Sequence, residues 1–135
     1  MFAKQFYLLI FQWPVTNPLS IHNLGQVIQF ANEAKILRAG NSKKGTQLKV
    51  EVILQGGQLA FFKPKRYDRD VKLEGKPFAG LDRHYGEIAA FYLSQILEYN
   101  SAPVVLGRTV QLAEEILKTA SASLSTTFSV AASKQ

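Results

Sequence analysis

A pair of glycines between two apolar segments constrains the fold of this chain more than any other feature. Residues 48–54 alternate between apolar and polar side chains, Gly56-Gly57 follows, and residues 59–63 return with apolar character. Two glycines between such segments are typical of a two-residue β-hairpin turn, because glycine readily adopts the positive φ that these turns require. The sequence therefore predicts an antiparallel hairpin.

The register of that hairpin places a lysine on its apolar face. Residues directly opposite each other in antiparallel strands lie on the same face of the sheet. A buried ammonium group needs a partner, and the two candidates are a carboxylate and an anionic ligand such as a phosphate. Lys63 is therefore the first candidate for a functional residue. The pairs expected from a two-residue turn are Leu54 with Leu59, Val52 with Phe61, and Val50 with Lys63.

A helix that follows the hairpin supplies a carboxylate. Asp82 is a good N-cap for a helix that runs to about Tyr99. On a 3.6-residue period, Glu87 shares a face with Phe91 and Ser94. A strand that ends in a lysine, followed by a helix with an inward glutamate, is typical of the N-lobe of protein kinases. The stripe expected to pack on the sheet comprises Ala89, Leu93, Ile96 and Leu97.

In that arrangement the ammonium contacts nucleotide phosphates and the carboxylate holds the flexible lysine in place. The polar segment 43–47, which contains Gly45, can lie over the phosphates because glycine lets the backbone approach them. Each residue also has a simpler alternative. Lys63 could be an edge lysine with its charge in water, and Glu87 could pair with Arg83 on a solvated helix.

The rest of the chain predicts an α+β domain. An apolar period over residues 20–38 indicates a helix that stops before Gly40, residues 104–112 read as a strand, and residues 113–119 as a short helix. The apolar run 6–11 lacks a small-residue cleavage site, so no signal peptide is expected. No apolar segment approaches the roughly 18 residues needed to cross a bilayer.

The charge distribution predicts an anionic partner. The formal net charge is +6, and residues 43–76 contain nine basic and four acidic residues. The string Lys63-Pro-Lys-Arg66 fits a nucleic-acid patch, but nearby acidic residues dilute it, so no nucleic-acid partner is expected. The chain has no cysteine and two histidines, which excludes disulfides and argues against a zinc site.

Several strings of this sequence resemble one family of enzymes. The chain is similar, over roughly residues 20–128, to the glycosaminoglycan xylosylkinases, secretory-pathway kinases related to the Golgi casein kinase. Residues 1–19 match poorly and residues 129–135 are unmatched, so the expected domain is a partial kinase N-lobe at 20–128. The strings that carry the resemblance include Gly45-Thr-Gln-Leu-Lys49, Phe62-Lys-Pro-Lys-Arg-Tyr67, Asp82-Arg-His84, Glu87-Ile-Ala-Ala-Phe91 and Gly107-Arg108.

The resemblance implies a reaction and its cofactors. The family transfers the γ-phosphate of ATP to the 2-hydroxyl of xylose in the proteoglycan linkage region, in the Golgi lumen and with Mn²⁺. Carried onto this sequence, Gln47 and Lys63 contact ATP, and Glu87 positions Lys63 and serves as a possible metal ligand. Asp82, Arg83 and His84 lie near enough in sequence to face the acceptor sugar.

The resemblance also implies that no catalytic residue lies in this chain. The catalytic and metal-binding aspartates of the family would follow residue 135, so the chain is expected to be inactive by itself. Two alternatives stay open. One is a non-catalytic basic module that binds a polyanion or an acidic glycan through residues 43–76, and the other is a pseudokinase-like regulator that pairs with a complete kinase.

Overall fold

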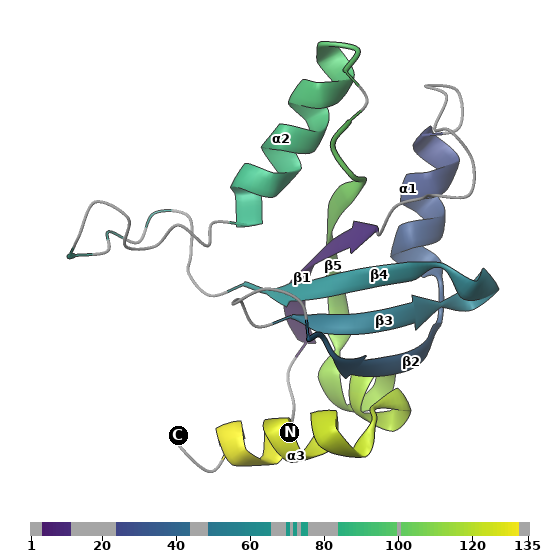
Figure 1. Cartoon of the computed structure of the whole chain (residues 1–135), viewed down its shortest axis with the longest axis vertical. Coiled ribbons are helices and arrows are strands. Elements are labelled where there is room, and N and C mark those ends of the chain that lie inside the picture. The colour runs from purple at the N-terminus through teal and green to yellow at the C-terminus, as the bar shows by residue number, and fades with distance from the viewer. Residues whose placement is uncertain are drawn as a thin grey trace.

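The computed structural model describes residues 4–11, 24–43, 49–65, 84–99 and 101–132, together with Asp70, Lys72, Glu74 and Gly75 (Figure 1). Within them, five strands form one antiparallel sheet in the order β2-β3-β4-β1-β5. Helices lie around this sheet, which confirms the expected α+β class. The strands are β1 (Lys4–Phe11), β2 (Ile36–Asn41), β3 (Val50–Leu54), β4 (Leu59–Pro64) and β5 (Val105–Gln111).

Three helices and three short helical turns complete the described structure. The helices are α1 (Leu24–Glu33), α2 (His84–Ile96) and α3 (Ala122–Ala132). Single turns follow β3 at Gln55–Gly57 and β5 at Leu112–Ile116 and Leu117–Thr119. α3 lies beside the edge strand β2, where the Ser121 N–H donates to the Ala39 carbonyl at 2.8 Å (Figure 1). Among the described residues, no helix has the length and apolar character needed to cross a membrane.

One interior strand of the sheet, β1, has no counterpart among the predicted elements. β1 pairs with β4 on one side and with β5 on the other, so that Leu8 lies opposite both Lys63 and Gly107. Residues 6–11 are a short, continuous apolar run. Such a run is consistent with a buried interior strand, but it has no alternation of apolar and polar residues that would identify a strand from sequence. The apolar run at residues 6–11 is therefore part of the domain.

The predicted helix over residues 20–38 is wrong at its C-terminal end. α1 ends at Glu33, and β2 begins at Ile36. Within β2, Ile36 and Ala39 are buried while the two residues between them are exposed, because the pairing with β3 shifts register between Ile36 and Arg38. The helical period was continued past Ala34 by the apolar Leu37, which is exposed on this strand, so the period ends with α1. Gly40 lies inside the strand and does not end a helix.

The hairpin itself is confirmed, but its predicted register is wrong by one residue. The turn contains three residues, Gln55–Gly57, and is closed by the Leu54 N–H donating to the Gln58 carbonyl at 2.8 Å. The observed pairs therefore include Val50 with Phe62 and Val52 with Ala60. A shift of one residue moves every side chain of a strand to the other face. Phe62 is fully buried, and Lys63 lies on the face opposite the core.

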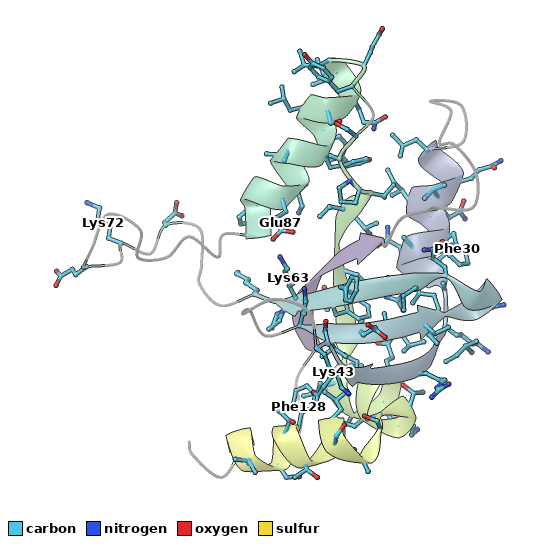
Figure 2. The ribbon with its side chains drawn as sticks, viewed as in Figure 1. Phe30, Lys43, Lys63, Lys72, Glu87 and Phe128 are labelled. Atoms are coloured by element: carbon cyan, nitrogen blue, oxygen red, sulfur yellow. The ribbon has the colours of Figure 1, made fainter. Side chains whose placement is uncertain are left out.

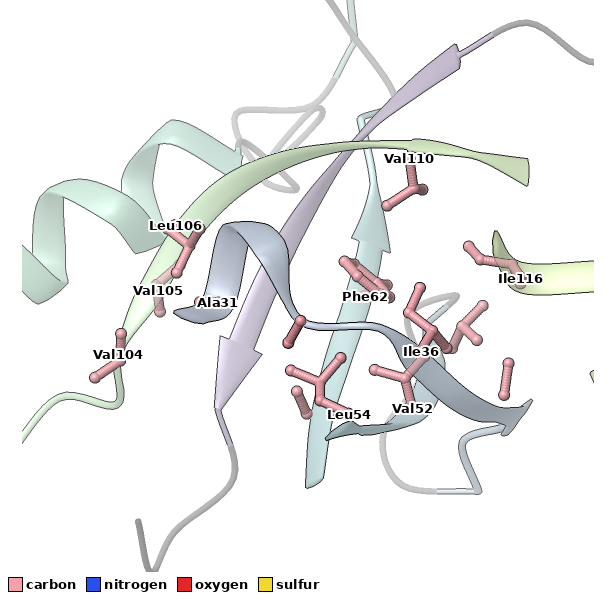
Figure 3. Close-up of a cluster of buried hydrophobic side chains, with 14 of the residues drawn as sticks. Ala31, Ile36, Val52, Leu54, Phe62, Val104, Val105, Leu106, Val110 and Ile116 are labelled. Carbon is pink, nitrogen blue, oxygen red and sulfur yellow. The ribbon is translucent and has the colours of Figure 1, made fainter. Parts of the chain in front are cut away.

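The core lies against one face of the β3–β4 hairpin (Figure 3). It joins Ala31 of α1 to the inward residues of the hairpin, to β5 and to the turn after β5. Every second residue of β3, from Val50 to Leu54, is buried, and the residues between them are only partly buried. This alternation is expected for a sheet with one face on the core. The largest fully buried side chains are Phe62, Phe91, Leu54, Ile116, Leu124, Val52, Val104 and Val110.

The turn between β3 and β4 offers a test of this register. Gly56 and Gly57 have φ of 83° and 84°, and a Cβ at either position would have no atom within 4 Å. A side chain at either position would therefore meet no steric clash, and it would destabilise the fold only through the unfavourable positive φ of the backbone. We expect Gly57→Ala to lower the free energy of unfolding by about 1–2 kcal/mol, measured by urea denaturation.

A matched glycine on α1 provides the control. Gly25 also has open space around a built Cβ, but it lies in a helix. Gly25→Ala should leave the free energy of unfolding unchanged or raise it by up to about 1 kcal/mol. Equal destabilisation by both substitutions would contradict the turn geometry.

Candidate functional site

The end of β4 and the first turn of α2 bring a lysine and a glutamate into contact. The Lys63 Nζ lies 2.5 Å from the Glu87 Oε1, and the two side chains are 22% and 39% exposed. Figure 2 shows the two side chains directed toward each other across the space between the strand and the helix. The structure therefore brings together the two residues that the sequence analysis paired.

The face of the sheet that carries Lys63 is polar and aromatic. On β4, Phe61 and Lys63 point away from the core face, because the buried residues are Ala60 and Phe62. The Lys49 ammonium lies over the Phe61 ring, 5.2 Å from its centroid. A cation is attracted to the face of an aromatic ring, so the Phe61 ring holds the Lys49 ammonium on this side of the hairpin. Two ammonium groups thus belong to this face of the hairpin.

α2 presents a mixed face to the rest of the domain. Phe91 and Ser94 are 1% and 7% exposed, and Glu87, on the same face, is partly buried. The predicted packing stripe is wrong: Leu93, Ile96 and Leu97 are all more than half exposed, and Ala89 is also exposed. The helix is rotated so that Glu87, Phe91 and Ser94 face inward. That rotation is what allows Glu87 to reach Lys63.

The other predicted site residues fall outside what the structure describes. Gln47 and the loop around it lie in the segment 44–48, and Asp82 and Arg83 precede α2. The alternative pair of Glu87 with Arg83 therefore lies outside the described residues as well. His84 is the first residue of α2, and its side chain is not described.

A buried arginine was not among the predicted site residues. Arg108 on β5 is 6% exposed, and its Nη1 donates to the carbonyls of Ala31 and Ala34 at 3.1 and 2.8 Å. Its Nη2 donates to the Glu115 Oε1 at 3.0 Å, and its guanidinium lies 5.9 Å from the centroid of the Phe62 ring. These carbonyls lie at and just beyond the C-terminal end of α1, where a cation is favourable.

Glu115 completes this network. Its second oxygen accepts a hydrogen bond from the Gln111 N–H at 2.6 Å, so the carboxylate ties the end of β5 to the turn that follows it. The sequence does indicate that Arg108 is buried. Arg108 alternates along β5 with Leu106 and Val110, and all three side chains lie on the buried face of the strand. A charge at an inward position of an apolar strand requires a partner. The network joins α1, β5 and the turn 112–116, and its role is structural.

The described residues supply little for a metal ion. Within them, no group of three or more histidine, cysteine, aspartate or glutamate side chains is close enough to hold one. Manganese and magnesium need several oxygen ligands, and the carboxylate of Glu87 provides at most one oxygen beyond the one bonded to Lys63. Most ligands of any metal at this site would therefore come from groups other than the described side chains.

Known proteins are similar to this chain over most of its length. The family model described as "Golgi casein kinase, C-terminal, Fam20" matches residues 3–135. The human glycosaminoglycan xylosylkinase is 48% identical over 120 residues, which cover 87% of this chain and 29% of that protein. The chain thus spans less than a third of the length of this curated relative.

Solved structures show the same fold. The structure of hydra Fam20 with sugar has 43% sequence identity and a TM-score of 0.69, and the match covers 76% of this chain and 30% of that one. The Golgi casein kinase with Mn/ADP bound has 26% identity and a TM-score of 0.71, covering 78% and 26% of the two chains. Because the family model covers residues 3–135, this chain belongs to the Fam20 family of Golgi casein kinase-like proteins.

Proposed function

We propose that this chain forms the ATP-binding part of a Fam20-type sugar kinase. The phosphate acceptor would be the 2-hydroxyl of xylose in the glycosaminoglycan–protein linkage region. The observation that carries the proposal is the contact of Lys63 with Glu87 at 2.5 Å, between the end of a strand and the first turn of a helix. The similarity to glycosaminoglycan xylosylkinase supports the choice of acceptor.

In this proposal Lys63 holds the phosphates of ATP. An ammonium has three N–H donors, and Glu87 accepts one of them. The remaining donors are available to phosphate oxygens, while the carboxylate limits the positions that the four-carbon side chain explores. Partial burial of the pair reduces competition by water. Gln47 would add a second contact to the nucleotide.

Mn²⁺ would accompany ATP at this site. A relative was solved with Mn/ADP bound, which supports the assignment of both the nucleotide and the metal. Glu87 would offer its second carboxylate oxygen to the metal, a hard ligand that suits a hard cation. Glu87 would thereby help to hold the cation, whose chemistry at such a site is to neutralise phosphate charge.

The acceptor would approach from the N-terminal end of α2. Asp82, Arg83 and His84 precede or begin this helix and would face the xylose. The compartment proposed for the protein is the Golgi lumen or another part of the secretory pathway, since relatives include kinases named as extracellular. Phosphoryl transfer itself is proposed for the complete kinase, because the chain spans under a third of the relatives.

A titration of the chain with ATP in the presence of Mn²⁺ tests the site. We expect Lys63→Met and Glu87→Gln each to weaken binding by roughly tenfold or more, because each removes a charge-assisted hydrogen bond or the group that positions it. Isothermal titration calorimetry measures the dissociation constants, and circular dichroism checks that the variants are folded.

Lys118→Met is the matched control for the loss of one positive charge. Lys118 pairs with Glu114 on the turns after β5, and both side chains are mostly exposed. This variant should bind ATP as the unmodified chain does. Unchanged affinity in both Lys63→Met and Glu87→Gln would refute the site.

A second candidate function rests on the basic stretch 43–76. In the described part of that stretch, Lys43, Lys65 and Lys72 are exposed, which favours binding of a polyanion such as an acidic glycan. Such binding would weaken steeply with salt and would be insensitive to Glu87→Gln. A regulatory pseudokinase role would instead appear as co-purification with a complete kinase.

A further inference from the structure

Ser94 is one of only two polar or charged residues that are buried in the part of the chain that the structure describes. The other is Arg108, whose partners are given above. Ser94 is 7% exposed and lies in the second half of α2. A buried hydroxyl is costly unless it forms hydrogen bonds, so its partners indicate why it is there.

Three backbone N–H groups donate to this one residue. The Ser94 Oγ accepts from the N–H groups of Ser101 and Ala102 at 3.2 and 3.3 Å. The Ser94 carbonyl accepts from the Tyr99 N–H at 3.0 Å. The last bond, with Glu98 at a φ of 57°, forms a helix-ending Schellman arrangement. Ser94 therefore fastens α2 to the connection that leads into β5.

The same face of α2 carries Glu87. Positions separated by three, four or seven residues lie on one side of a helix, so Glu87, Phe91 and Ser94 form a single inward row. Glu87 contacts Lys63, Phe91 is buried, and Ser94 holds the connection to β5. These three contacts fix how far α2 is rotated about its own axis. The exposed positions of α2 away from this row include Leu93 and Ile96.

We propose that Ser94 is a positioning residue for the phosphate-binding pair. By holding the connection at residues 101–102, its hydroxyl sets the rotation and axial position of α2, and this places the Glu87 carboxylate against Lys63 two helical turns away. Ser94 does not touch the nucleotide. The effect on ATP binding rests on the proposed function, whereas the effect on the contact between Lys63 and Glu87 does not.

The first test needs no ATP. The ¹⁵N signal of the Lys63 ammonium reports slow proton exchange only while the group is hydrogen-bonded and shielded from water. We expect Ser94→Ala to accelerate that exchange by severalfold or to abolish the signal, and Ser94→Thr, which keeps the hydroxyl, to retain it. Leu124→Val is the control for lost stability, since Leu124 is a buried residue of α3, away from α2.

Each outcome of the first test decides the proposal. Faster exchange in Ser94→Ala alone supports it. Unchanged exchange in Ser94→Ala, equal loss in Ser94→Thr, or equal loss in Leu124→Val overturns it, because the hydroxyl would then have no specific effect on Lys63.

The second test is a double-mutant cycle on ATP affinity. Ser94→Ala should raise the dissociation constant roughly two- to thirtyfold, the range of couplings transmitted through packed elements. In the Glu87→Gln background the same substitution should have no further effect, since Ser94 acts through Glu87. Equal effects in both backgrounds would overturn the proposal. If the unmodified chain does not bind ATP, the proposed function fails, and the ammonium measurement still decides the role of Ser94.

Discussion

Replacement of Arg108 by methionine should lower the free energy of unfolding by about 3–5 kcal/mol, the range for breaking a buried ion pair by removal of one partner. The substitution keeps an unbranched side chain but leaves the carbonyls of Ala31 and Ala34 without their donor. It also leaves the Glu115 carboxylate without its cation. Because Glu115 is about a third exposed, water would relieve part of that loss, and we expect a value near the lower end.

The ion pair of Lys118 with Glu114 provides the control for this prediction. Both side chains are mostly exposed and lie four residues apart, an arrangement worth about 0.3–0.5 kcal/mol. Urea denaturation of Arg108→Met and Lys118→Met should therefore differ by several kcal/mol. Similar midpoints for the two variants would show that the Arg108 network does not hold α1 to β5.

Truncation of Phe62 should be comparably severe, at about 3–5 kcal/mol for Phe62→Ala. Phe62 is fully buried in the core and lies against the Arg108 guanidinium, so its removal leaves a cavity. The neighbouring ring is the matched comparison. Phe61 is only partly buried and contacts Lys49, so Phe61→Ala should cost about 1 kcal/mol, the scale of an exposed cation–π contact and limited packing.

This pair of variants distinguishes the observed hairpin register from the register of a two-residue turn. In the observed register Phe62 is on the core face, whereas in the alternative Phe61 is on it. Denaturation of both variants under the same conditions measures the difference. A larger loss for Phe61→Ala would contradict the three-residue turn.

The hairpin shows what local sequence can and cannot determine. Alternation and the two glycines predict its existence and its place in the chain. They do not reveal that Gln55 joins the turn. In a two-residue turn Gln55 would pair with Gln58, whereas here the Leu54 N–H donates to the Gln58 carbonyl and the Gln55 N–H donates to the Lys35 carbonyl outside the hairpin. On a two-residue turn, Lys63 was therefore predicted to lie on the core face, and that prediction is wrong. The lysine is on the other face, and α2 brings its partner there.

Periodicity failed where an apolar residue was not buried. Leu37 continued the helical period beyond α1 but is an exposed residue of β2, and α2 buries Phe91 and Ser94 in preference to its most apolar stripe. A single sequence contains no information on which face a neighbouring element will cover. The contact of Lys63 with Glu87 was predictable because it depends on the order of elements and two charged residues, which the sequence shows directly.

The position of β1 has a consequence for how the domain is made. Lys4 pairs with Gln111 and Leu8 with Lys63, so both partners of β1 lie far along the chain. During synthesis β4 has only β3 beside it until β1 docks, and β1 cannot be flanked on both sides until β5 has left the ribosome. Such distant pairings slow folding, since a large loop must close before any contact is gained. Until then the unpaired edge of β4 is a surface at which nascent chains can associate with one another or with chaperones.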